Sequence, residues 1–245
     1  MKPLKILVTG DRARSRDRSA LPLQLDSRPV EWLEVPVLTF KPLPVAAETL
    51  QRLADQPADW IFFTSPRAVR FWGEAWMEMG NDFPTATQVA CIGDVTAEAA
   101  SQDGFTADFC PSEPGSEKFL EEFEAVLADM NQKPRIVIPM AQGGWLTIAQ
   151  RLSELGCAVE VIPLYRSEPR ADVGMSLTQK EVAAVDGFLF TSPSSVEAFL
   201  SHFQVGPRAK VFAIGSYTES ALVKHGLGQV KKIPGSDINR IKEVW

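Results

Sequence analysis

The stretch DWIFFTSPRAV, residues 59–69, recurs later in the chain as DGFLFTSPSSV, residues 186–196. In each copy an apolar run is followed by Thr-Ser-Pro and then by residues with helical periodicity. A short, continuous apolar run is typical of a parallel strand that is buried on both faces. Serine is a preferred N-cap and proline is favoured at the first helical position. Each copy therefore predicts one strand-turn-helix unit of an α/β fold.

Two further segments recur in the same order around these copies, each built on a strand-like apolar run. They are CIGDVT (91–96) with AIGSYT (213–218), and KILVT (5–9) leading to VPV (35–37) with RIVIP (135–139) leading to IPL (162–164). Self-similarity of this kind marks an internal repeat. The chain is therefore interpreted as a tandem duplication of one α/β unit.

Strand-like runs and segments of helical period alternate along the whole chain, several of the latter ending in glycine. We predict strands at 5–9, 60–64, 88–92, 135–139, 187–191 and 210–214, and helices at 46–54, 65–79, 95–102, 116–130, 146–155, 192–202 and 216–225, with glycine caps at Gly80, Gly104, Gly156 and Gly226. This pattern predicts an α/β fold with two similar domains, each a parallel sheet flanked by helices.

Two proline doublets, Val35-Pro36 and Ile162-Pro163, lie in extended runs in the middle of each repeat. Proline restricts itself and its predecessor to extended geometry, which suits strand-like linkers between domains. If the chain crosses at both doublets, the halves of the repeats are interleaved. Two contiguous repeats divided near residue 132, with the prolines on loops, remain the alternative. The interleaved division gives residues 1–35 with 168–245 as one domain, 41–162 as the other, and 36–40 and 163–167 as linker strands.

The composition excludes several classes of protein. With 25 Lys and Arg against 31 Asp and Glu the net charge is −6, which disfavours nucleic acid as the main ligand. No apolar run approaches the roughly 18 residues of a membrane-spanning helix, and the first ten residues lack a signal-peptide apolar region. Three scattered cysteines and only two histidines disfavour metal sites, redox pairs and a Ser-His-Asp triad. We expect a cytoplasmic protein without bound metal.

The duplicated turns are the candidate ligand site. Carboxyl ends of parallel strands and helix N-termini are where α/β proteins bind ligands, and free N–H groups there attract anions. For any one of these turns, good helix capping or tight packing of helix on strand is the simpler explanation. The Phe-Thr-Ser-Pro turn and the Ile-Gly-x-x-Thr turn each occur twice at matching positions, however, which favours a shared role in ligand binding. No dinucleotide or phosphate-loop fingerprint is present. The hydroxyls at these turns are Thr64, Ser65, Thr96, Thr191, Ser192 and Thr218.

An arginine-rich segment and a tyrosine are further candidates because of their positions in the chain. Four arginines from Arg12 to Arg18 follow the first predicted strand, either as a solvated helix start or as a positive rim for carboxylate recognition. Tyr165, one of two tyrosines, follows the second linker doublet. There its ring could pack between the domains, or its hydroxyl could donate a hydrogen bond or a proton into a cleft.

Taken in order, these motifs resemble the uroporphyrinogen-III synthase family over residues 5 to about 234. Phe-Thr-Ser-Pro, Ile-Gly-x-x-Thr, Arg-Ile-Val-Ile-Pro and Ile-Pro-x-Tyr-Arg occur, and then the first two recur. The resemblance implies two α/β domains joined by a two-stranded linker. It implies a lyase of tetrapyrrole biosynthesis that closes the linear tetrapyrrole hydroxymethylbilane to uroporphyrinogen III, inverting ring D, without metal or cofactor.

The resemblance also assigns roles to residues. Tyr165 corresponds to the family tyrosine that assists departure of the substrate hydroxyl. Ser65, Thr96, Ser192 and Thr218 correspond to hydroxyls that face the ligand, with Thr64 and Thr191 beside them. The family often has arginine directly after the first Val-Thr, where this chain has Gly10-Asp11, and Arg12 is the candidate for that contact. The family implies a monomer, with at most a transient contact with the preceding pathway enzyme.

Two other functions are compatible with the duplicated turns. A non-catalytic two-domain binding protein for an anionic small molecule would share the hydroxyls but form no product. The hypothesis of a nucleotide-dependent transferase is weakened by the missing phosphate loop.

The scarcity of histidine and cysteine suits the function that the resemblance implies. Positioning the eight carboxylates of the substrate needs dispersed donors rather than imidazole or thiolate, as in an enzyme that acts by positioning its substrate.

Overall fold

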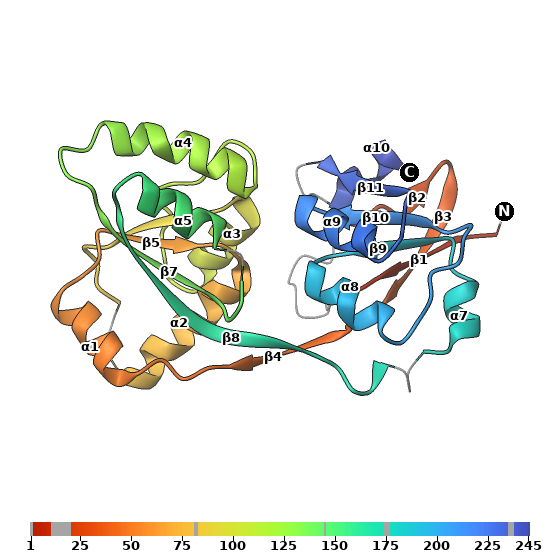
Figure 1. Ribbon diagram of the computed structural model, residues 1–245, viewed down its shortest axis with the longest axis horizontal. Coiled ribbons are helices and arrows are strands. Elements are labelled where there is room, and N and C mark those ends of the chain that lie inside the picture. The colour runs from red at the N-terminus through yellow and green to blue at the C-terminus, as the bar shows by residue number, and fades with distance from the viewer. Residues whose placement is uncertain (1, 11–20, 81–82, 145, 174–176, 235–237) are drawn as a thin grey trace. The chain divides into compact units, whose positions relative to one another are not determined.

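The chain folds as two compact units, seen in the computed structural model of Figure 1. The structure describes residues 2–10, 21–80, 83–144, 146–173, 177–234 and 238–245. Unit 1 comprises Met1–Thr39 with Ser167–Trp245, and unit 2 comprises Phe40–Arg166. The chain passes between the units within β4 (Leu38–Pro42) and β8 (Ala158–Pro169). We propose that these units are the two expected domains, 1–35 with 168–245 and 41–162. The expected linker strand 36–40 overlaps β4, and 163–167 lies within β8.

Unit 2 is a sheet with helices on both faces. Its strand order is β4-β8-β7-β5-β6, with β5 (Trp60–Phe63), β6 (Gln88–Cys91) and β7 (Arg135–Ala141). The four strands from β8 to β6 are parallel. All four residues of β5 are buried because its side chains alternate between two cores: Ile61 and Phe63 face one, and Trp60 and Phe62 face the other.

The two cores of unit 2 are covered by different helices. The core of Ile61 and Phe63 also contains buried residues of α1 (Ala47–Asp55), α2 (Pro66–Met79) and α3 (Asp94–Gln102). The core of Trp60 and Phe62 contains residues of α4 (Ser116–Ala128) and α5 (Thr147–Glu154). A parallel sheet buried on both faces is the expected α/β arrangement.

Unit 1 repeats this arrangement. Its strand order is β11-β10-β9-β1-β3-β2, with β1 (Leu4–Val8), β2 (Gln24–Leu25), β3 (Arg28–Glu34), β9 (Gly187–Phe190), β10 (Lys210–Ile214) and β11 (Val230–Ile233). One face is covered by α7 (Gln179–Ala183), α8 (Pro193–Leu200) and α9 (Ser216–Lys224). The other face packs against a C-terminal segment with the short helices η2 (Ile238–Arg240) and α10 (Ile241–Val244).

The strand orders reveal the duplication in three dimensions. The order β10-β9-β1-β3 in unit 1 matches β6-β5-β7-β8 in unit 2, strand for corresponding strand of the repeat. The strands of each repeat are thus divided between the two sheets. The predicted α/β fold, with a duplicated unit and interleaved halves, is confirmed.

The prediction of purely parallel sheets is wrong, because each sheet is mixed. Strand β2 runs antiparallel to β3. The Leu43 N–H donates to the Leu164 carbonyl and the Arg170 N–H to the Val37 carbonyl, so β4 runs antiparallel to β8. A two-residue strand and a strand crossing between units carry little apolar signal, which explains the omission. Among the described residues, no helix is long and apolar enough to cross a membrane.

Candidate active site

The turn after β5 positions the first pair of hydroxyls. Ser65 is the N-cap of α2, with Pro66 at the first helical position. The Ser65 Oγ accepts a hydrogen bond of 3.1 Å from the Ala68 N–H. Because this bond uses a lone pair of the oxygen, the Ser65 O–H remains a donor. Thr64 precedes it and is partly exposed. The turn thus presents hydroxyl groups at the positive end of the α2 dipole.

Tyr165 lies at the same edge of the unit 2 sheet. Its strand partner is Ala141, at the carboxyl end of β7, and the register shifts between Met140 and Ala141. Such a bulge lets consecutive residues point to one face of a sheet. Leu164 and Tyr165 are accordingly both buried in the core that also contains Phe71. The bulge therefore directs the tyrosine ring into that core.

The Tyr165 side chain is held at both ends. Its ring stacks on Phe71, with centroids 5.0 Å apart, and meets the edge of Phe40 at 6.1 Å. The Arg67 guanidinium lies 3.4 Å from the centroid of Phe40. The Tyr165 Oη lies 3.5 Å from the Ser65 Oγ, a long contact in which either group could donate. The ring therefore packs inside the core of unit 2, and the hydroxyl lies near a candidate site residue.

Thr96 occupies the first turn of α3, after the turn that contains Gly93. A Cβ on Gly93 would lie 2.6 Å from the Pro114 Cβ, so only glycine fits this turn without a shift. Thr96 is 3% exposed. In the described part of the chain the Thr96 hydroxyl has no hydrogen-bond partner. The oxygen is nevertheless not fully buried, because the fully buried side-chain polar atoms without a partner in that part of the chain are three indole nitrogens. The Thr96 oxygen is therefore unpaired yet reaches the surface.

The corresponding turn of unit 1 is more tightly bonded. Ser192 caps α8 in a capping box with Ser195: the Ser195 N–H donates to the Ser192 Oγ at 3.1 Å, and the Ser192 N–H donates to the Ser195 Oγ. The Thr9 Oγ1 donates to the buried Ser195 Oγ at 2.9 Å. The Thr191 Oγ1 donates to the Thr9 carbonyl at 3.3 Å. The Thr191 proton is therefore engaged within the protein, whereas Ser192 keeps a hydroxyl that can donate.

Thr218 repeats the environment of Thr96. It follows Gly215, whose φ of 78° favours glycine, and it is 2% exposed. Its hydroxyl also lacks a hydrogen-bond partner among the residues that the structure describes. Beside it, the Lys232 ammonium donates to the Ser216 Oγ at 3.1 Å. The N-terminus of α9 thus combines helix N–H groups, hydroxyls and a positive charge, which is suited to carboxylate binding.

Comparison with known proteins gives this geometry a family. A profile of uroporphyrinogen-III synthase HemD matches residues 20–235. The chain belongs to the uroporphyrinogen-III synthase family. The chloroplastic uroporphyrinogen-III synthase of Oryza sativa subsp. japonica is 27% identical over 245 residues, covering 96% of this chain and 78% of the relative.

Two solved structures share the fold. A mutant uroporphyrinogen III synthase of Thermus thermophilus has a TM-score of 0.60 at 18% identity and covers 98% of both chains. The enzyme of Helicobacter pylori has a TM-score of 0.60 at 17% identity, over 98% of this chain and 97% of the other. As a member of this family the chain is a lyase of tetrapyrrole biosynthesis, as its sequence predicted, and the binding-protein alternative gains no support.

The predicted site residues of this chain fall into two groups. Thr64, Ser65, Thr96 and Tyr165 belong to unit 2, and Thr191, Ser192 and Thr218 belong to unit 1. The structure brings Tyr165 and Ser65 together, and Thr191 and Ser192 share one turn. Arg12 lies outside the described residues.

Three polar residues were not identified from the sequence, although they lie at the carboxyl ends of the strands or beside these turns: Thr9, Ser195 and Lys232. Ser195 lies within the quoted repeat, and its spacing of three from Ser192 is a capping-box signal that could have found it. The sequence marks Thr9 only as the last residue of a predicted strand, with no pattern that indicates a polar contact. Lys232 lies in β11, a four-residue strand with two lysines that carries no strand pattern.

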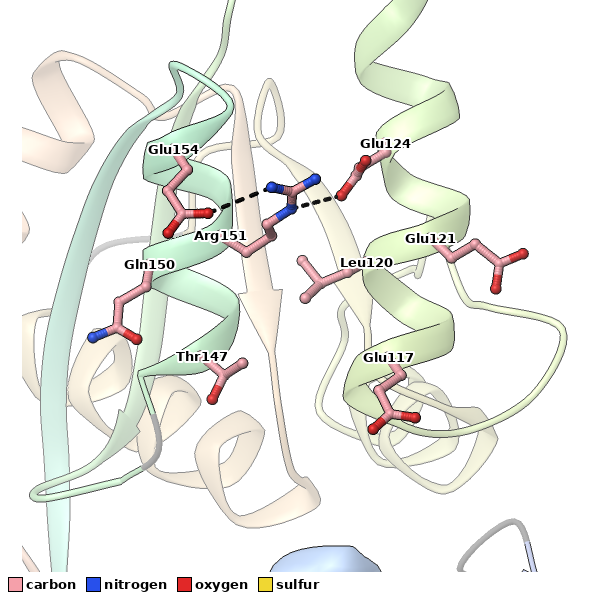
Figure 2. A pocket seen from close by; sticks show the side chains of 8 residues that line it. All are labelled: Glu117, Leu120, Glu121, Glu124, Thr147, Gln150, Arg151 and Glu154. Carbon is pink, nitrogen blue, oxygen red and sulfur yellow. Dashed lines mark hydrogen bonds and ion pairs between the residues drawn. The ribbon is translucent and has the colours of Figure 1, made fainter.

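A groove of about 550 Å³ lies elsewhere on unit 2, between α4 and α5. Its lining includes Glu117, Glu121 and Arg151, and Figure 2 shows Arg151 paired with Glu124 and Glu154, at 2.9 and 3.4 Å. It contains none of the predicted site residues. Among the described residues, no group of three or more His, Cys, Asp and Glu side chains could hold a metal ion.

Proposed function

We propose that the chain closes the linear tetrapyrrole hydroxymethylbilane to uroporphyrinogen III, with inversion of ring D and loss of water. The observation that carries the chemical step is the placement of the Tyr165 hydroxyl beside Ser65 at the carboxyl edge of the unit 2 sheet. In this step the C–O bond of the substrate hydroxymethyl group breaks and the hydroxyl leaves as water, so a donor must face that oxygen.

Tyr165 is the proposed donor. When its hydroxyl donates to the departing oxygen, negative charge grows on the phenolic oxygen. The Ser65 hydroxyl, 3.5 Å away at the N-terminus of α2, can then donate to that oxygen, and the helix dipole favours the charge. Stacking on Phe71 keeps the ring in place without engaging the hydroxyl.

The duplicated turns are proposed to bind substrate carboxylates. Ser192 caps α8 and keeps a donating hydroxyl, and Thr96 and Thr218 offer unpaired hydroxyls next to helix N-termini. Ser65 has one proton, which is proposed to face a substrate carboxylate on binding and the Tyr165 oxygen when the substrate hydroxyl leaves. Lys232 adds a cation at the start of α9. Thr64 and Thr191 are proposed as neighbours that shape the turns, and Arg12 as a further carboxylate ligand. Such dispersed donors fix one conformation of a polyanionic substrate, which is the main requirement for a reaction controlled by positioning.

We further propose that the protein acts in the cytoplasm as a monomer, without metal or cofactor, and that its contact with the preceding pathway enzyme is at most transient. Freshly prepared hydroxymethylbilane given to the purified protein tests the activity. Chromatography of the oxidised products is expected to show the type III isomer, whereas heat-denatured protein yields the uninverted type I isomer. Type I alone with native protein would disprove the proposed function.

A further inference from the structure

Two exposed apolar side chains occupy the same position of the duplicated turns. Val95 is 65% exposed and Tyr217 is 37% exposed. Each is the second residue of its helix, α3 or α9, and each directly precedes the buried threonine, Thr96 or Thr218. The sequence pattern Ile-Gly-x-x-Thr therefore brings an apolar side chain and an unpaired hydroxyl to one helix start in both units.

Helix propensity does not explain these apolar residues, because valine and tyrosine are weaker helix formers than many polar residues. Val95, which is 65% exposed, also gains little from burial. Single exposed apolar residues are ordinary. Other large apolar residues of the described chain that are exposed lie at unmatched positions: Leu23, Met77, Leu146 and Val223. The recurrence beside the same hydroxyl is what indicates a shared ligand.

The substrate class of the proposed function has the matching chemistry. Each pyrrole ring of a linear tetrapyrrole has two apolar faces and carries anionic carboxylate chains. A helix N-terminus with a hydroxyl binds the carboxylate, and an apolar side chain one residue away covers the ring face. An aromatic ring such as that of Tyr217 adds offset stacking.

We propose, on the basis of the proposed function, that Val95 and Tyr217 each contact a pyrrole ring of the substrate and help to hold the rings in the arrangement that leads to inversion. They are positioning residues. The two turns are unequal: Lys232 lies at the start of α9, whereas the exposed Asp94 carboxylate begins α3. The Tyr217 turn therefore binds its carboxylated ring more strongly, and Tyr217 contributes more than Val95.

The test compares Tyr217→Ser and Val95→Ser with two matched controls. Val223→Ser removes an exposed apolar side chain from the other end of α9, and Met77→Ser does so at the end of α2. From the apolar area lost we expect KM to rise about three- to tenfold for the turn variants, more for Tyr217→Ser, with kcat within about twofold. The type I fraction is expected to increase. The controls keep wild-type KM. Val95→Ser, Val223→Ser and Met77→Ser keep the wild-type melting temperature because these side chains are more than half exposed. Tyr217 is 37% exposed, so KM of Tyr217→Ser is measured well below the melting temperature of that variant.

Tyr217→Phe separates the ring from the hydroxyl. Since it keeps the ring face, its KM should return toward that of the wild type. A KM as high as that of Tyr217→Ser would overturn the proposal, as would turn variants that match Val223→Ser while the wild type forms the type III isomer. A wild type that forms only type I would instead refute the proposed function itself, and this inference with it.

Discussion

The Oη of Tyr165 lies 3.5 Å from the Oγ of Ser65, the residue that caps α2. The two residues are 100 positions apart in sequence. They meet because β7 lies between β5 and β8 in the sheet and a bulge turns Tyr165 toward the α2 side. The phenol is thus anchored by its ring and leaves its polar end at the edge where the hydroxyl turns lie.

Replacing Tyr165 by phenylalanine tests the role of the hydroxyl. The ring keeps its stacking on Phe71, so the melting temperature should stay within about 2 °C of the wild type. Loss of the donor should lower kcat at least tenfold, toward the roughly 10²-fold that proton transfer typically contributes. Steady-state kinetics and product binding by calorimetry check this. Wild-type kcat in a folded Tyr165→Phe protein would contradict a chemical role.

Ser192 offers a pair of substitutions that separate capping from ligand binding. Aspartate and asparagine both cap helices well, so Ser192→Asp and Ser192→Asn should be about equally stable. Only aspartate places a negative charge where substrate carboxylates are proposed to bind. KM should therefore be at least about fivefold higher for Ser192→Asp than for Ser192→Asn, a modest value for like charges near a surface. Equal KM values for the two variants would argue against an anion site at α8.

The Lys232 ammonium should attract the anionic substrate without contributing to the stability of the fold. Lys232→Gln is expected to raise KM about two- to fivefold, the range for an exposed ionic contact, and to weaken the dependence of KM on salt. The control is Lys224→Gln, which removes the same charge from the last turn of α9. Equal effects of both substitutions would show that net charge acts, and not a specific contact at the helix start.

The sequence predicted the βα turns well because their signals are local. Ser65 and Ser192 cap helices as expected, and Gly80, Gly104, Gly156 and Gly226 all have positive φ at or next to helix ends. Strand β3 was missed since Pro29 and its charged residues obscure its alternation. Strand β11 was missed because two of its four residues are exposed lysines.

The site itself could be predicted only in part. The residue types at the turns were visible, but the contact of Tyr165 with Ser65 depends on the bulge near Leu164, which has no sequence signal. The engagement of Thr191 was also hidden, because its partner Thr9 is 182 positions away. Long-range register decides which hydroxyls are free, and local pattern does not contain it.

The hydrogen bond between Thr9 and Ser195 should be a stabilising feature specific to unit 1. The corresponding residues of unit 2 are Pro139 and Ala68, which cannot form it. Thr9→Val and Ser195→Ala should each lower the free energy of unfolding by about 0.5–1.5 kcal/mol for the loss of this bond. The Ser195 Oγ keeps its bonds with Ser192 in the first variant, and the Thr9 Oγ1 keeps the Leu189 carbonyl as an acceptor in the second. The double variant should lose less than the sum of the two. Urea denaturation checks this, and strict additivity would show that the two hydroxyls do not interact.

Cys91 should make the protein less stable in alkaline solution. Burial, and secondarily the nearby Cys110, raises the pKa of the Cys91 thiol to about 12. The unfolded chain ionises this thiol near its ordinary pKa of about 8.5, so from there to about pH 12 the folded state holds a proton that the unfolded state loses. Stability from this thiol is therefore complete below that range and is lost as pH rises through it. Melting temperatures at pH 8 and pH 10 should fall more steeply for the wild type than for Cys91→Ala and Cys91→Ser, which lack the titrating group. Equal slopes in all three proteins would mean that other groups control the alkaline limit.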